Sequence, residues 1–162
     1  MFDVTQEIII NAPADDVWEV LALQYDRVSE WATGIQASSV NPEPELLEGA
    51  PVTGRHCEVP GLGKTNERFT AFDANRRKFT YEAYAGMPFF VKTVSNTWQV
   101  ADEGERTRVS MHLVADLNAF PGTLMAPFLR RQFEKNTETV VNDLKYYVEH
   151  GQPSPSKRAE MQ

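Results

Sequence analysis

Residues 123–149 read TLMAPFLRRQFEKNTETVVNDLKYYVE, and this stretch decides the fold. It follows the breaker pair Pro121-Gly122 and is closed by Gly151. Apolar residues, with one threonine among them, recur at steps of three and four, which places them on one face of a helix. That face comprises Leu129, Phe133, Thr137, Val140 or Val141, Leu144 and Val148. The opposite, water-facing side carries Arg130, Arg131, Glu134, Lys135, Glu138 and Lys145.

A helix of this length suits a wide sheet. At about 1.5 Å per residue it would be roughly 40 Å long. This is too long to bury against one or two helices, whereas a curved antiparallel sheet offers a surface of that length. Thr137 interrupts the apolar face, which indicates a pocket between the helix and the sheet.

The length and composition favour one soluble, cytoplasmic domain. The chain has 162 residues, of which 41% are hydrophobic and 24% charged. Its net charge of −7 argues against nucleic acid or an anionic membrane as a partner. We expect no membrane insertion, because no apolar run approaches the length of a span. The single Cys57 excludes an intramolecular disulfide, and the N-terminus carries no secretory signal.

Upstream of the helix, the pattern is that of a sheet. Residues 2–11 form a predicted strand that stops at Pro13, and two short helices follow over 14–23 and 26–31. Six further segments alternate or are rich in β-branched residues, with turns between them. These segments are 35–40, 52–59, 65–72, 78–84, 89–100 and 107–117. We therefore predict an α+β fold with about seven antiparallel strands and a long C-terminal helix, in one domain over 1–150.

The last residues follow no such pattern. Residues 151–162 have no hydrophobic periodicity and contain two prolines and several polar residues. We expect them to form a disordered C-terminal tail.

Several short motifs occur along the chain in a defined order. They are INAPADDVWEVL at 10–21, Trp31, Gly54-Arg55, Glu67-Arg68-Phe69 with Asp73, Asn96-Thr97-Trp98 and Thr107-Arg108-Val109. In order and spacing they resemble the helix-grip superfamily (SRPBCC). That superfamily includes START lipid-transfer domains, birch-pollen-allergen proteins, plant abscisic acid receptors and bacterial polyketide cyclase/dehydrase-like proteins. The resemblance covers residues 4–150, is nearest to the polyketide cyclase-like group, and implies a curved sheet wrapped around the long helix.

The resemblance also implies a cavity between the sheet and the long helix that holds a lipid, hormone or polyketide. Glu67 matches a cavity glutamate of the abscisic acid receptors, and Tyr81 matches an aromatic residue of their pocket. Phe133 and Thr137 match helix positions that close the pocket. The turn at 60–63 lies near the receptors' gate loop, but it is shorter and differs in sequence.

Glu67 is the strongest candidate for a catalytic residue. It lies on a strand whose residues Phe69 and Ala71 are expected to face inward, so its carboxyl group would enter an apolar cavity. Such surroundings favour the protonated form, which can donate a proton in a dehydratase or an aldol cyclase. The structural alternative is an ion pair with Arg55 on the preceding strand.

Two further residues are candidates to assist Glu67, namely His56 as a general base and Tyr81. Strand alternation, however, puts Arg55 and His56 on opposite faces, so both cannot serve one pocket. The histidines and Cys57 lack the spacing of metal ligands, and we predict no metal site. The chain has no phosphate loop or dinucleotide fingerprint, so we predict no cofactor.

Aromatic residues on the strands could line a cavity or form an ordinary core. The lining that we predict is Trp31, Glu67, Phe69, Tyr81, Phe133 and Thr137. On the segment 89–100, one face carries Thr93, Ser95 and Thr97, and the other carries Val94, Asn96 and Trp98. The pattern leaves open which of these faces points inward.

Three functions fit this pattern. The first is binding of a small hydrophobic molecule, such as a lipid, polyketide or aromatic compound, with Glu67 fixing its orientation. The second is a polyketide cyclase or dehydratase that uses Glu67 as general acid, assisted by Tyr81 or His56. The third is an interaction or stress-associated protein whose cavity is filled by its own side chains. Both a monomer and a homodimer fit the sequence.

Overall fold

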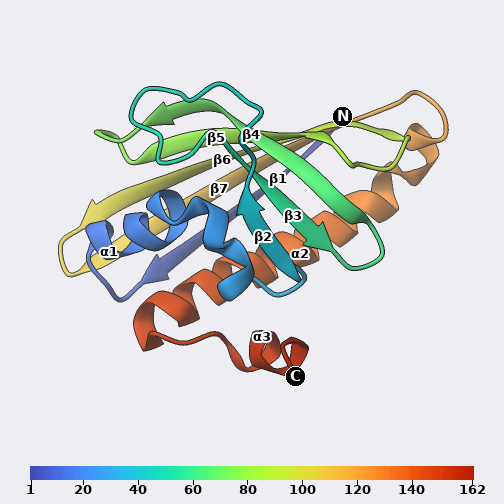
Figure 1. Ribbon diagram of the computed structural model, residues 1–162. Helices are drawn as coiled ribbons and strands as arrows, with labels where there is room; N and C mark the ends of the chain where they lie inside the picture. Colours follow the sequence, from blue (N-terminus) through green and yellow to red (C-terminus); the bar gives the residue numbers. More distant parts are fainter.

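The computed structural model describes residues 1–162 and contains a seven-stranded antiparallel sheet with a long helix along one face (Figure 1). The strand order is β1-β7-β6-β5-β4-β3-β2, so β1 and β2 are the edge strands. The elements are β1 Phe2–Ile10, α1 Ala14–Trp18, η1 Glu19–Leu23, η2 Tyr25–Glu30, β2 Ala37–Val40, β3 Gly54–Val59, β4 Gly63–Asp73, β5 Lys78–Ala85, β6 Val91–Glu103, β7 Arg106–Leu117, α2 Gly122–His150 and α3 Pro155–Glu160. This architecture confirms the predicted α+β helix-grip fold.

The long strands β6 and β7 alternate between the core and the outer face. The buried residues of β7 are Thr107, Val109, Met111, Leu113 and Ala115. The turn between the two strands contains Gly104 at φ +84°, a conformation that glycine adopts without strain. On β6, the inward residues are Val94, Asn96 and Trp98, which decides the face that the sequence leaves open.

Helix α2 buries the predicted face. Thr137, Val141 and Leu144 are buried in the middle and C-terminal part of the helix. The helix ends at Gly151, which has φ +67° and whose N–H donates to Tyr147 O at 2.8 Å. No helix of the chain combines the length and the apolar character needed to span a bilayer.

The position of α2 over the sheet leaves space above the central strands. The helix makes most of its strand contacts with the edge strand β1. Polar bonds hold it there: Gln6 Nε2 donates to Thr137 Oγ1 at 3.1 Å, and Lys145 Nζ donates to Ile9 O at 2.7 Å. Because β4, β5 and β6 lie farther from α2, side chains alone do not fill the volume between them.

The C-terminal segment differs from the expected disordered tail over 151–162. Residues Pro155–Glu160 form a short helix, capped by Ser154, that lies near the C-terminal end of α2 (Figure 1). Ser154 Oγ donates to Asp143 Oδ1 at 2.6 Å, and the buried Lys157 donates to Ile35 O at 2.7 Å. Hydrophobic periodicity misses this helix because polar contacts to distant residues hold it.

Candidate functional site

A cavity of about 590 Å³ lies between α2 and the inner face of the sheet. Its apolar wall includes Leu21, Val28, Trp31, Val94, Trp98, Leu113, Phe133 and Val140. The turn between β3 and β4 contributes Pro60 and Leu62. Small-molecule sites typically measure about 300–1,000 Å³ and are mostly apolar with a few polar groups, so this cavity has the size and lining of such a site.

Polar side chains of the wall come from neighbouring strands. Arg55 on β3 lies directly across from Glu67 on β4, and both are buried. The guanidinium Nη2 and Nε atoms lie 2.6 Å and 2.8 Å from Glu67 Oε2. The hydroxyl group of Tyr25 donates to the same oxygen at 3.0 Å. The carboxylate therefore has a charged partner, and the ion pair that the sequence offers as a structural alternative is present.

Two aromatic rings surround the charge of Arg55. Its Cζ atom lies 3.9 Å from the ring centroid of Tyr25 and 5.3 Å from that of Tyr81. Burial, the largest single influence, lowers the pKa of Arg55, but Glu67 and the other neighbouring groups together raise it well above its usual range. Arg55 is therefore a permanent cation whose charge is balanced inside the protein.

The Tyr81 hydroxyl and the Cys57 thiol, which lie in the same region, keep their protons at neutral pH. Burial raises the pKa of the Tyr81 hydroxyl to about 12, and the nearby Glu67 carboxylate adds to this increase. Burial likewise raises the pKa of the Cys57 thiol to about 12. Tyr81 is consequently a hydrogen-bond donor at the cavity wall, and Cys57 is not an activated nucleophile.

The structure brings most of the predicted lining residues together. Trp31, Glu67, Tyr81, Phe133 and Thr137 all border the cavity. Phe69 does not border it: its ring lies in the core against that of Tyr25, with the ring centroids 4.3 Å apart. The expectation for Phe69 is corrected because Tyr25 stands between it and the open space. A role of the other five in binding stays a prediction.

His56 lies on the other face of the sheet from Arg55 and Glu67. Its Nδ1 is 2.8 Å from Asn66 Oδ1, outside the cavity. The candidate role of His56 as a general base that assists Glu67 is therefore corrected, because strand alternation separates the two side chains. No group of three or more His, Cys, Asp or Glu side chains is placed to hold a metal ion.

Two cavity residues carry little signal in the sequence. Tyr25 lies at the junction of two short helical segments, where no periodicity indicates its orientation. Asn96 is a polar residue on the inward face of β6, and its Nδ2 donates to the Tyr81 hydroxyl oxygen at 3.2 Å. The pairing of β5 with β6 places Tyr81 and Asn96 opposite each other, and only the register of the two strands reveals this contact.

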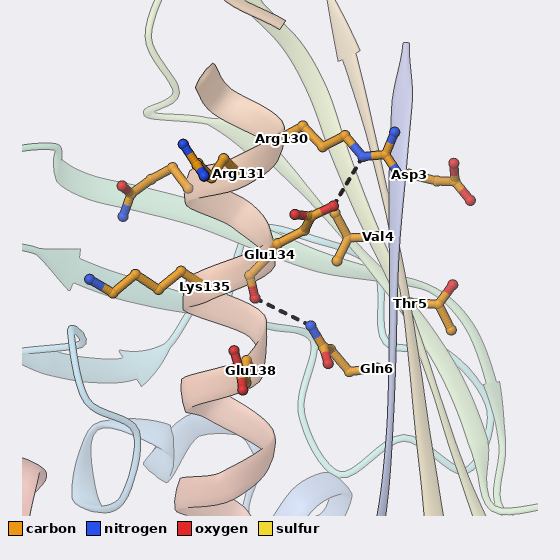
Figure 2. A pocket seen from close by; sticks show the side chains of 10 residues that line it. Asp3, Val4, Thr5, Gln6, Arg130, Arg131, Glu134, Lys135 and Glu138 are labelled. Carbon is orange, nitrogen blue, oxygen red and sulfur yellow. Dashed lines mark hydrogen bonds and ion pairs between the residues drawn. The ribbon is translucent and has the colours of Figure 1, made fainter. Parts of the chain in front are cut away.

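A second hollow lies between β1 and the outer side of α2 (Figure 2). Its volume is about 740 Å³, but Val4 is its single hydrophobic lining residue. Arg130 and Glu134 form an ion pair along the helix at 3.1 Å, and Gln6 Nε2 donates to Glu134 O at 3.2 Å (Figure 2). This groove is a solvated polar surface, and the smaller apolar cavity is the better candidate site.

Several solved structures share this fold. The aromatase/cyclase Zhui from Streptomyces sp. R1128 superposes with a TM-score of 0.76 at 18% identity, over 91% of this chain and 93% of that one. A START superfamily protein from Mycobacterium smegmatis gives 0.73 at 11% identity, over 91% and 97%. The protein XoxI from Bacillus cereus gives 0.70 at 19% identity, over 93% and 97%. At these identities the likeness concerns the fold alone. No curated protein matches the sequence significantly.

A family model covers almost the whole domain. The model described as "Polyketide cyclase / dehydrase and lipid transport" matches residues 1–149. This match agrees with the fold and with the resemblance that the short motifs indicate. The chain therefore belongs to the polyketide cyclase/dehydrase and lipid transport family.

Proposed function

We propose that this protein binds a small hydrophobic molecule in the cavity between α2 and the sheet. The observation that carries the proposal is an apolar cavity of about 590 Å³ with a compact polar cluster on one wall. Family membership supports a hydrophobic-ligand or cyclase role. Burial of apolar ligand surface, at about 25 cal/mol per Å², would drive binding.

Native mass spectrometry of freshly purified protein, with solvent extraction of anything bound, tests this proposal. We expect a discrete added mass that Phe133→Trp abolishes, because a larger side chain at the cavity wall occupies ligand volume. Phe128→Trp is the matched control, since Phe128 lies on the same helix but is 67% exposed and outside the cavity. Loss of the added mass in both variants, or in neither, would contradict a site in this cavity.

A second candidate function is slow conversion of the bound molecule, as in a cyclase or dehydratase. Glu67 and Tyr81 both border the cavity, so a carboxylate and a hydroxyl donor meet the same ligand. The Tyr81 O–H can stabilise a developing oxyanion, because it holds its proton at neutral pH. The extracted compound is incubated with wild type, Glu67→Gln and Tyr81→Phe. Product that forms with wild type and is lost in a variant that still binds supports an enzyme.

A further inference from the structure

Three buried side-chain polar atoms of the chain lack a hydrogen-bond partner, and all three belong to residues that border the cavity. They are Trp31 Nε1, Thr33 Oγ1 and Asn96 Oδ1. Trp31 and Asn96 are each only 3% exposed. Buried polar atoms in native proteins nearly always have a partner, and leaving one without costs free energy. Because all three residues border one cavity, a polar group of a bound molecule is the candidate partner for these atoms.

The wall near Asn96 offers an acceptor and a donor side by side. Asn96 Nδ2 donates to the Tyr81 hydroxyl oxygen, so Asn96 Oδ1 remains as a free acceptor. The Tyr81 hydroxyl accepts this bond and donates to no protein atom, so its own proton is available. A hydroxyl group on a ligand can donate to Asn96 and accept from Tyr81 at the same time.

Glu67 adds a second acceptor to this wall. The hydrogen bonds from Arg55 and Tyr25 both end at Oε2, which leaves Oε1 without a partner in the protein. Arg55 directs Nε and Nη2 to Glu67 and Nη1 to Tyr25 O, so its charge is already balanced by the Glu67 carboxylate. The other cation of the cavity wall, Lys135, is a solvent-exposed side chain of α2. A ligand carboxylate at this wall would meet acceptors and the like charge of Glu67.

We propose that the cavity selects an uncharged apolar molecule carrying a hydroxyl group, held between Tyr81 and Asn96, over the corresponding carboxylic acid. This inference rests on the proposed binding function and adds the chemical class of the ligand. An oxygen acceptor elsewhere on the same molecule satisfies Trp31 Nε1. Apolar ring or chain atoms fill the remaining space against Trp98 and Phe133.

Three fluorescent probes that share one ring system test the selection. They are 2-hydroxyanthracene, 2-methylanthracene and 2-anthracenecarboxylate, titrated into the full chain at neutral pH. We expect the hydroxyl probe to bind at least about tenfold more tightly than the methyl probe, because only the hydroxyl satisfies the buried acceptor. The carboxylate should bind more weakly than the methyl probe.

Two variants assign the effect to its residues. Asn96→Leu and Tyr81→Phe should each remove most of the advantage of the hydroxyl probe while the methyl probe keeps its affinity, which also shows that each variant folds. Ser95→Ala is the control, since Ser95 neighbours Asn96 on the outward face of β6 and does not border the cavity. It should leave the advantage unchanged.

The outcomes separate this inference from the binding function. If the hydroxyl probe binds no better than the methyl probe, or the carboxylate binds best, the inferred ligand class is wrong although the cavity binds apolar molecules. An advantage that survives in both Asn96→Leu and Tyr81→Phe also overturns it. If none of the probes binds and purified protein carries no added mass, the binding function itself is wrong.

Discussion

Glu67 and Arg68 are adjacent in the chain and form ion pairs on opposite faces of the sheet. Glu67 pairs with Arg55 at the cavity wall, where the two residues are 9% and 5% exposed. Arg68 pairs with Glu82 on the outer face, with its side chain 48% exposed. The two pairs share their chemistry and differ in burial, so they test what burial does to an ion pair in this fold.

Removing the buried cation should destabilise the protein far more than removing the exposed one. Arg55→Met leaves the Glu67 carboxylate buried without its charged partner, which costs about 3–5 kcal/mol of unfolding free energy. Arg68→Met, the matched control, should cost no more than about 1 kcal/mol. Urea unfolding at neutral pH measures both. Equal losses for the two variants would mean that Glu67 finds another partner or is reached by water.

Truncation of Phe133 distinguishes an open cavity from a filled one. In a filled core, Phe→Ala costs about 3–5 kcal/mol, and Phe69→Ala should show this cost because Phe69 is 5% exposed and does not border the cavity. Phe133 packs against Phe2 on one side but borders the cavity on the other. We therefore expect Phe133→Ala to cost less than about 2 kcal/mol in thermal or urea unfolding. A cost equal to that of Phe69→Ala would favour an interaction protein with a filled cavity.

Cys57 should make the protein sensitive to alkali. Well below pH 9.0, the usual pKa of the thiol, Cys57 is protonated in both the folded and the unfolded chain, so it causes no pH dependence. Above this value the unfolded chain loses the proton, whereas the folded chain retains it up to a pKa of about 12. The unfolded state then binds fewer protons, so the unfolding free energy falls as pH rises, by about 1.4 kcal/mol per pH unit.

Cys57→Ala isolates this contribution. Tyr25 and Tyr81 have usual pKa values of 10.0 and raised values in the fold, so they add to the slope only above that pH. Urea unfolding of wild type and variant between pH 9 and 10 should therefore show a shallower slope for Cys57→Ala. Parallel slopes would show that the thiol ionises in the folded protein.

The contact between Lys157 and Ile35 should order the loop that precedes β2. Lys157 is 1% exposed, and its Nζ donates to Ile35 O and to Glu160. Lys157→Met removes these donors, which should cost about 1–3 kcal/mol and speed amide hydrogen exchange in the segment 33–36. Arg158→Met is the control, because Arg158 makes no side-chain hydrogen bond. Unchanged exchange in Lys157→Met would contradict an ordering role for this contact.

Much of the fold follows from local patterns. The steps of three and four from Leu129 to Val148 predict α2, and the alternation of Val109, Met111 and Leu113 predicts β7. Strand alternation alone also predicts that the side chains of Arg55 and His56 point to opposite faces of the sheet. These features depend on residues close in the chain, so a single sequence suffices to predict them.

Local sequence patterns predict only some of the residues in the cavity wall. Family resemblance indicates Glu67 and Tyr81, but the insertion of Tyr25 between Phe69 and the cavity depends on how η2 meets the sheet. The opposition of Tyr81 and Asn96 depends on the register of β5 with β6. The folded C-terminal segment depends on polar bonds to Asp143 and Ile35, for which hydrophobic periodicity gives no signal.

By itself, the sequence determined the elements from β1 to α2, their order, the buried face of α2 and the inward position of Glu67 on the sheet. Each of these follows from periodicity or motif order, which are properties of neighbouring residues. Only the tertiary structure decided that α2 rests on β1 and leaves a cavity over β4 to β6, and that Arg55 neutralises Glu67 there. Those outcomes depend on sheet curvature and on contacts between distant segments, and no local pattern encodes them.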